Sequence, residues 1–133
     1  MGESNLIIFE YKRERQIAIN EVTIMMIDFN QIDPMTLPGM NNGTGTMSAR
    51  MYNDDSYRII PTAIHPGGSI GNHTQESGDD LNYIISGNGK AICDGIEEEL
   101  EPGVMHICPK GLNHTIMNTG EEDLVILTIV VKK

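Results

Sequence analysis

Short apolar stretches that alternate with polar residues recur along this chain of 133 residues, from residue 47 to its end. Alternation with a period of two is typical of β-strands that bury one face, and β-branched residues are favoured in such strands. The pattern predicts strands over residues 47–52, 57–65, 70–75, 80–86, 90–94, 97–100, 104–108, 114–118 and 124–131.

Glycine and proline mark the ends of these stretches. The chain contains 14 glycines and 6 prolines, and the pair Asp94-Gly95 is typical of a two-residue hairpin turn. Helical periodicity is weak beyond residue 45. With about ten strands joined by tight turns, the expected fold class is all-β, with the strands arranged as a compact barrel of two sheets.

The first 46 residues follow a different pattern. Residues 6–11 and 17–29 are apolar and β-branched and predict two strands, with a helix over 12–27 as the alternative. Residues 30–46 are rich in proline, glycine and asparagine and predict a loop.

This change of pattern suggests two regions. We expect an N-terminal strand extension over residues 1–29 and a single barrel domain over residues 30–133. A barrel of this size leaves strand edges that need cover. We therefore expect a homodimer in which residues 17–29 take part, with the extension exchanged between copies.

The charge balance disfavours several classes of partner. The chain has 19 acidic residues against 9 lysines and arginines, a formal net charge of −10 at pH 7. An acidic surface repels phosphate backbones and anionic lipids, so we expect neither nucleic-acid nor membrane binding. No apolar run reaches the ~18 residues of a membrane span, and no signal peptide is recognisable. Cys93 and Cys108 form no metal-type or redox-type motif, which favours a reduced, cytoplasmic protein.

Two histidine patterns lie within the predicted barrel. The first comprises Gly67, His73, Gln75, Asp80 and Gly87. The second comprises Gly103, Pro109, Gly111, His114 and Asn118. Side chains two positions apart on a strand share a face, so His73 and Gln75 point the same way. Imidazole, amide and carboxylate groups are metal ligands, and this combination suits a first-row divalent ion.

The two patterns resemble the paired motifs of the cupin superfamily, which belongs to the jelly-roll folds. The second pattern matches at every fixed position, whereas the first departs at two ligand positions. Gln75 stands where that family usually has a second histidine, and Asp80 stands where it usually has glutamate. The short spacing between Gly87 and Gly103 is similar to that of small single-domain microbial cupins.

The resemblance implies a double-stranded β-helix, or jelly-roll barrel, with one divalent metal ion at its centre. Zn, Ni, Fe, Mn and Co are the candidates, and the sequence does not choose among them. The implied ligands are His73, Gln75, Asp80 and His114. An amide oxygen is a harder and weaker donor than an imidazole nitrogen, so Gln75 shifts the preference away from the softest ions. Gln75 and Asp80 also have alternative roles, as a pocket amide and as a turn residue.

Three more polar residues are candidates for lining the pocket. Asn82 is two positions past Asp80 and shares its face, and Asn118 shares the face of His114. His106 shares a face with Cys108, but the sequence does not show which face of that strand is inside.

Three functions stay open at this point. The resemblance implies a metal-dependent enzyme of the dioxygenase, isomerase or lyase type that acts on a small oxygenated metabolite. The second possibility is a non-catalytic cupin that binds or senses a small molecule, with a weak or empty metal site. The third is an oligomeric barrel whose polar interior has only a structural role. Because one fold hosts many chemistries, the fold cannot decide among them.

Overall fold

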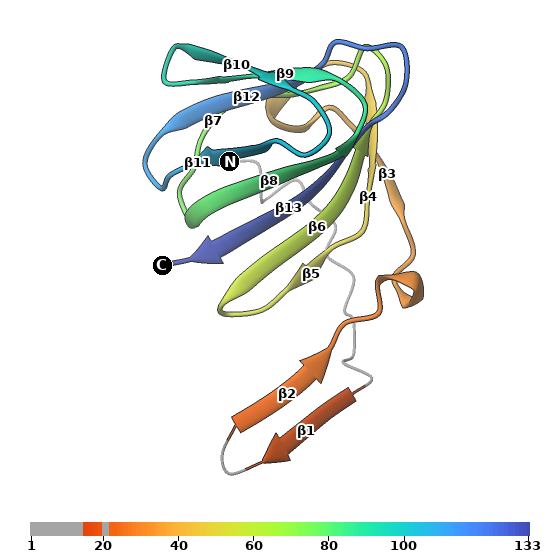
Figure 1. Ribbon diagram of the computed structural model, residues 1–133, viewed down its shortest axis with the longest axis vertical. Helices are drawn as coiled ribbons and strands as arrows, with labels where there is room; N and C mark the ends of the chain where they lie inside the picture. The colour runs from red at the N-terminus through yellow and green to blue at the C-terminus, as the bar shows by residue number, and fades with distance from the viewer. Residues whose placement is uncertain (1–14, 20–21) are drawn as a thin grey trace.

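The regular secondary structure of the described chain is almost entirely antiparallel β-sheet. The computed structural model of the protein describes residues 15–19 and 22–133 (Figure 1). Within this part of the chain, no helix has the length and hydropathy that a membrane span requires. The all-β expectation is therefore confirmed.

A four-stranded sheet forms one wall of the barrel, in the order β10-β9-β12-β7. Its members are β7 (Ser69–Thr74), β9 (Gly89–Cys93), β10 (Ile96–Leu100) and β12 (Asn113–Asn118). β10 is at one edge of this sheet and β7 is at the other.

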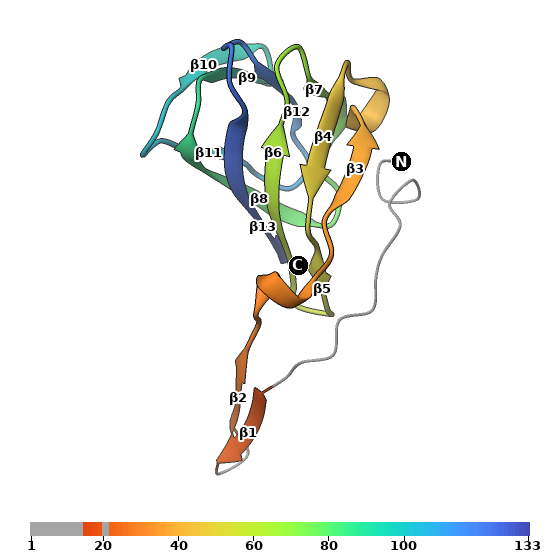
Figure 2. The ribbon, with the colours of Figure 1, turned by 90° about the vertical axis from the view of Figure 1, so that its right-hand side faces the viewer.

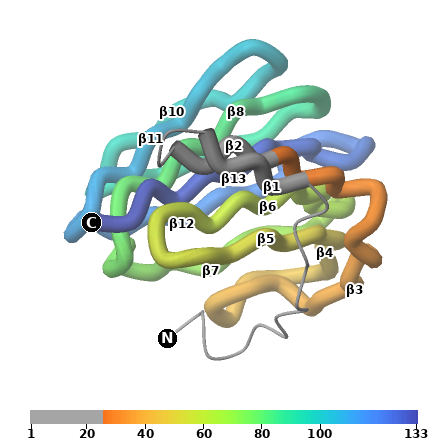
Figure 3. The backbone as a smooth tube through the Cα atoms, turned by 90° about the horizontal axis from the view of Figure 1, so that it is seen from below, coloured from red at the N-terminus to blue at the C-terminus, as the bar shows by residue number. Residues whose placement is uncertain are grey.

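A seven-stranded sheet forms the facing wall (Figure 2, Figure 3). Its order is β11-β8-β13-β6-β4-β3, and β5 also pairs with β6. The strands are β3 (Met35–Pro38), β4 (Thr46–Ala49), β5 (Tyr52–Asn53), β6 (Tyr57–Ile64), β8 (Gly78–Ser86), β11 (Met105–Cys108) and β13 (Leu124–Lys132). Two short 3-10 turns, η2 (Phe29–Gln31) and η3 (Met40–Asn42), flank β3.

The interior of the barrel is apolar at one end and polar at the other. The apolar core comprises Met35, Leu37, Met47, Ile64, Ile84, Ala91, Leu100, Ile116, Leu124 and Ile126. Along β8 the buried, inward positions change from Ile84 to Asn82 and then to Asp80. Apolar burial at one end stabilises the barrel, and the other end is left for polar groups that need partners.

The turns follow the sequence closely. Asp94 and Gly95 have φ values of 50° and 83°, and Cys93 pairs with Ile96 on either side of them, so the hairpin predicted there is confirmed. Gly87 ends β8 with φ of 87°, and a Cβ atom at this position would lie 2.3 Å from the Asp123 carbonyl oxygen. Only glycine fits such a close approach.

The loop predicted over residues 30–46 is wrong in its centre, which forms β3 and pairs with β4. Met35 and Leu37 are buried and Thr36 between them is exposed, which is the alternation of a half-buried strand. The prolines next to this alternation obscured it. Pro38 is tolerated because it ends an edge strand, where one face of the backbone has no partner to donate to.

The single strand predicted over residues 17–29 is also wrong. This segment contributes to two strands, β1 (Arg15–Ile19) and β2 (Val22–Met26), which pair as a hairpin. The hairpin projects away from the barrel in two views (Figure 1, Figure 2). The strand predicted over residues 6–11 lies outside the described residues. The division into two regions at residue 29 stays a prediction.

Candidate metal centre

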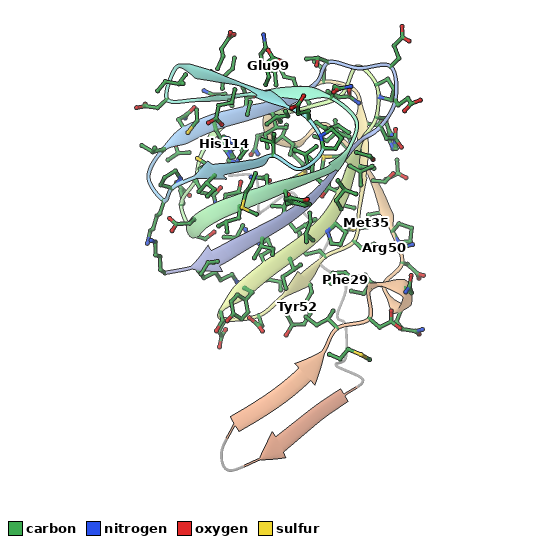
Figure 4. All side chains as sticks on the ribbon, viewed as in Figure 1. Phe29, Met35, Arg50, Tyr52, Glu99 and His114 are labelled. Atoms are coloured by element: carbon green, nitrogen blue, oxygen red, sulfur yellow. The ribbon has the colours of Figure 1, made fainter. Side chains whose placement is uncertain are left out.

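Three strands bring His73, Asp80 and His114 to one point. His73 on β7 and His114 on β12 are directly opposite each other in the ladder of the small sheet. Asp80 comes from β8 in the facing sheet, so the cluster connects the two walls. The Nε2 atom of His114 lies 3.2 Å from Nε2 of His73 and 3.2 Å from Oδ2 of Asp80. Figure 4 labels His114 within the barrel.

The hydrogen bonds behind the two imidazoles determine which nitrogen carries the proton. Nδ1 of His73 faces the Gly71 carbonyl oxygen at 3.0 Å, and a carbonyl can only accept, so this Nδ1–H donates. Nδ1 of His114 faces Nε2 of His106 at 2.9 Å. In the neutral ring of His73, Nε2 is then left with a lone pair that faces His114 and the Asp80 carboxylate, and a proton on Nδ1 of His114 would leave its Nε2 with a lone pair at the same point.

With His114 in that tautomer, three electron-pair donors face one another and repel, and a cation among them would relieve the repulsion. Two ligands that are each about 2.1 Å from one ion, at a roughly tetrahedral angle, lie about 3.4 Å apart, close to the observed separations. The second carboxylate oxygen, Oδ1 of Asp80, is buried and has no hydrogen-bond partner. A buried charged oxygen without a partner is costly, so both observations fit a metal ion at this point. The ligand atoms of the three residues lie within 4.8 Å of one another.

Burial lowers the pKa of His73 below its usual value of 6.5, and the nearby His114 adds to this effect. The hydrogen bond to Gly71 and the Asp80 carboxylate act in the opposite direction. The neutral form of the ring is the form that binds metals. His73 is therefore in the protonation state that a ligand requires at neutral pH.

Gln75 lies beside the cluster and is held in place by its backbone. Its N–H donates to the Leu112 carbonyl at 2.8 Å, and its own carbonyl accepts from the Gly111 N–H at 2.7 Å. Gly111 adopts φ of 94°, which turns the loop back toward β7 just before β12 begins at Asn113. The Gln75 side chain is 6% exposed and hydrogen-bonds His73. Its role as a metal ligand stays a prediction.

The three predicted pocket residues have different positions. Asn82 lines the cavity next to the cluster, where its Oδ1 accepts from the Thr128 hydroxyl at 2.8 Å. His106 is 1% exposed and lies behind His114, so it does not line the cavity. Asn118 lies at the other end of β12, where its amide donates to the carbonyls of Ile64 and Glu122.

A cavity of about 480 Å³ opens from the cluster of His73, Asp80 and His114, a volume within the usual range for small-molecule sites. Its wall is mostly apolar, with contributions from Leu37, Met40, Met47, Met51, Ile60, Ile70, Ile116 and Val130. Arg58 is the single lysine or arginine among its described lining residues, and it is buried.

Arg58 and Glu98 were not predicted from the sequence. The sequence pattern could have identified Arg58, because it is a lone basic residue at an inward position of an otherwise apolar strand. Glu98 contacts His106 but stands in a run of three glutamates on the exposed strand β10, and nothing in that run distinguishes it.

The two cysteines are near the cluster but do not supply a ligand. The Sγ atoms of Cys93 and Cys108 are 3.9 Å apart, and both thiols are free. Burial raises the pKa of Cys108 to about 12, with a further contribution from Cys93. Because a cysteine binds metals as the thiolate, Cys108 is unsuited to this role at neutral pH.

Comparison with known proteins agrees with the fold. A family model described as "Cupin domain" matches residues 62–130, which include His73, Asp80 and His114. The oxalate-binding protein of Thermotoga maritima is 25% identical over 119 residues, covering 85% of this chain and 98% of that protein.

Two solved structures show the same fold. The crystal structure of a predicted oxalate decarboxylase from Thermotoga maritima superposes with a TM-score of 0.75 at 24% identity, covering 82% of this chain and 100% of that one. The cupin domain of Schizosaccharomyces pombe Cnp3 has a TM-score of 0.70 at 11% identity, covering 92% and 90% of the two chains. Because the family model spans more than half of the sequence and the barrel agrees with it, this chain belongs to the cupin family, as a small single-domain member.

Proposed function

We propose that this cupin binds one divalent metal ion through His73, Asp80 and His114, with Gln75 as a fourth donor, and uses it to bind a small oxygenated metabolite. The single observation that carries the proposal is the convergence of two imidazole lone pairs and a carboxylate at 3.2 Å, at the end of a cavity. Nitrogen and oxygen donors of this kind suit Zn, Ni, Fe, Mn or Co.

The second part of the site is Arg58. The strand register places Arg58 opposite Val130, and Val130 opposite Asp80, so Arg58 and Asp80 share one inward row of the large sheet. Two strand spacings separate their backbones by about 10 Å. Both residues line the cavity, so a small carboxylate bound there could contact Arg58, since a guanidinium binds carboxylates through two parallel hydrogen bonds. The name of the Thermotoga relative, an oxalate-binding protein, supports a ligand of this class.

Different groups in the cavity would contact different parts of the ligand. A bound divalent ion would act as a Lewis acid toward an oxygen of the ligand. Arg58 would hold the carboxylate at the other side of the row, and the Thr128 hydroxyl, which donates to Asn82, fixes that amide beside the cluster. The apolar wall limits water around the bound ligand, which strengthens each charged contact.

The metal site is tested by elemental analysis of protein purified without added metal, followed by titration with each of the five ions. We expect close to one ion per chain for the best-bound metal, and loss of binding in His73→Ala and His114→Ala. The control is His65→Ala, because His65 bonds Ser48 and Asp123 away from the cluster. Protein that binds none of these ions would refute the proposal.

A second candidate is a binding or sensing protein without turnover, which the name of the Thermotoga relative, an oxalate-binding protein, favours. Calorimetry of the metal-loaded protein with oxalate and related dicarboxylates, followed by mass analysis of the recovered ligand, separates the two. An enzyme of the dioxygenase, isomerase or lyase type returns altered ligand, whereas a binding protein returns it unchanged. Arg58→Gln should weaken binding in both cases without changing metal content.

We further propose that the chain forms a homodimer and works in the cytoplasm. An isolated two-stranded hairpin is marginal in water, so the projecting β1–β2 hairpin needs another protein surface. On β6, β13, β8 and β11 most outward positions are apolar, which offers a surface of that kind on a second copy. Two free thiols are typical of proteins that are kept reduced.

A further inference from the structure

We propose that Glu98 and His106 form a positioning relay that holds His114 in the tautomer whose Nε2 lone pair faces His73 and Asp80. The inference rests on the proposed metal site, because it concerns the orientation of one of its ligands. Neither Glu98 nor His106 lines the cavity, so both act through His114.

The relay is a continuous chain of short contacts. Nδ1 of His106 lies 2.6 Å from Oε1 of Glu98, and Nε2 of His106 lies 2.9 Å from Nδ1 of His114. The two imidazoles are nearly parallel, with an interplanar angle of 27°. Both rings are 1% exposed, whereas the Glu98 side chain is 50% exposed. The chain therefore runs from the protein surface to the buried cluster.

The direction of the hydrogen bonds follows from the surface end. A carboxylate only accepts, so the Nδ1–H of His106 donates to Glu98, and Nε2 of the neutral His106 is left as an acceptor. The Nδ1–H of His114 then donates to His106, and Nε2 of His114 is left with its lone pair toward the cluster. A metal-bound histidine whose other ring nitrogen donates to an outer partner is a more basic and better oriented ligand.

The fold places the relay where the two sheets meet. Glu98 belongs to β10, an edge strand of the small sheet, and His106 belongs to β11, an edge strand of the large one. His114 is on β12, in the small sheet again. The relay thus crosses between the walls twice, and the approach of β10 to β11 determines how His114 is held.

A merely structural role for His106 would predict different behaviour. A buried imidazole that only needs hydrogen-bond partners would satisfy itself with Glu98, and the tautomer of His114 would not depend on it. The two interpretations therefore differ in one observable, the ring nitrogen of His114 that carries the proton after Glu98 or His106 is replaced.

Nitrogen NMR of isotope-labelled, metal-free protein at about pH 8, where ordinary imidazoles are neutral, reads this tautomer directly. In the wild type we expect the proton on Nδ1 of both His106 and His114. In Glu98→Leu and His106→Leu we expect His114 to become a mixture of tautomers, while His73 stays unchanged because Gly71 holds it. Glu98→Gln should retain the wild-type tautomers, because its amide oxygen still accepts.

The matched control is Glu99→Leu, the same substitution one position along the strand. Glu99 lies on the surface and contacts Lys90, not His106, so the tautomers should not change. A cobalt titration then measures the effect on metal binding. We expect the affinity for cobalt to fall about 10- to 100-fold in Glu98→Leu and His106→Leu, and to be retained in Glu98→Gln and Glu99→Leu.

The outcomes separate the relay from the metal site. A wild-type His114 with its proton on Nε2, or an unchanged tautomer in Glu98→Leu, overturns the relay even if cobalt binds. Should His106→Leu fail to fold, Glu98→Leu decides the question, because it changes a half-exposed side chain. The expected tautomers in a protein that binds no metal would leave the relay standing and overturn the proposed function.

Discussion

At the residue scale, Gln75 changes the donor chemistry of the site more than Asp80 does, because Asp80 is still a carboxylate. Gln75 offers an amide oxygen at a position where an imidazole is expected, yet it is buried beside His73 and tethered by two backbone hydrogen bonds to the loop that precedes His114. The backbone at position 75 is therefore fixed next to the cluster, and the role of Gln75 as a metal ligand stays a prediction.

We predict that Gln75→His raises the affinity for Ni and Zn by about tenfold or more, because an imidazole nitrogen is the stronger donor to both. Metal titration of the two proteins measures this change. Thr36→His, which adds the same ring on the exposed face of β3, should leave the affinity as it is. Unchanged Ni and Zn affinity together with disturbed ligand binding would show that Gln75 recognises the organic ligand instead.

At the element scale, the two ends of β12 make different kinds of contact. His114 serves the cluster at its start, and Asn118 fixes its end to two other segments. The Asn118 amide donates to the Ile64 and Glu122 carbonyls, both at 2.8 Å, and its oxygen accepts from the Gly120 N–H at 2.9 Å. This residue was expected in the pocket, but its contacts are those of a clamp between β6, β12 and the following turn.

We predict that Asn118→Ala lowers the free energy of unfolding by about 2–3 kcal/mol, because it leaves a buried carbonyl without its donor. Metal affinity should change little, since the cluster is at the other end of the strand. Urea unfolding and metal titration on the same protein check both statements. Asn113→Ala is the matched control for stability, because its amide makes one exposed hydrogen bond to Thr74. Equal losses in the two variants would contradict the clamp.

At the scale of the whole molecule, the outer face of the large sheet belongs neither to the core nor to the cavity of the barrel. Its outward residues form apolar rows across four strands: Ile59, Ile129, Leu81 and Ile107 in one, and Pro61, Leu127, Tyr83 and Met105 in the next. The side chains nearest the β11 edge are about half exposed. In a chain with a net charge of −10, an uncharged face of this width is typical of an interface.

We predict that light scattering gives a mass twice the 14.7 kDa of one chain. Ile107→Lys places a charge in the apolar face and should shift the protein toward the monomer. Ile96→Lys is the matched control: Ile96 is 69% exposed but belongs to β10 in the other sheet, so the dimer should persist. A wild-type monomer at all concentrations would remove this proposal and leave the metal site untouched.

Much of this protein could be predicted from the sequence, because the relevant signals are local. Alternation along each strand predicts which residues face inward, and the hairpin at Asp94-Gly95 requires only two residues. The spacing of His73, Asp80 and His114 was sufficient to propose one cluster. Where local signals conflicted, prediction failed: the prolines around β3 obscured a strand that exists because it pairs with β4.

Tertiary structure alone decided which partners those inward residues meet. Arg58 shares a row with Asp80 because β13 lies between their strands, and Glu98 reaches His106 because two sheet edges approach each other. Such contacts join residues from separate strands, and no periodicity within one strand encodes them. The sequence determined the donors and the faces on which they lie; the pairing order of the strands determined the cavity, the relay and the direction of each lone pair.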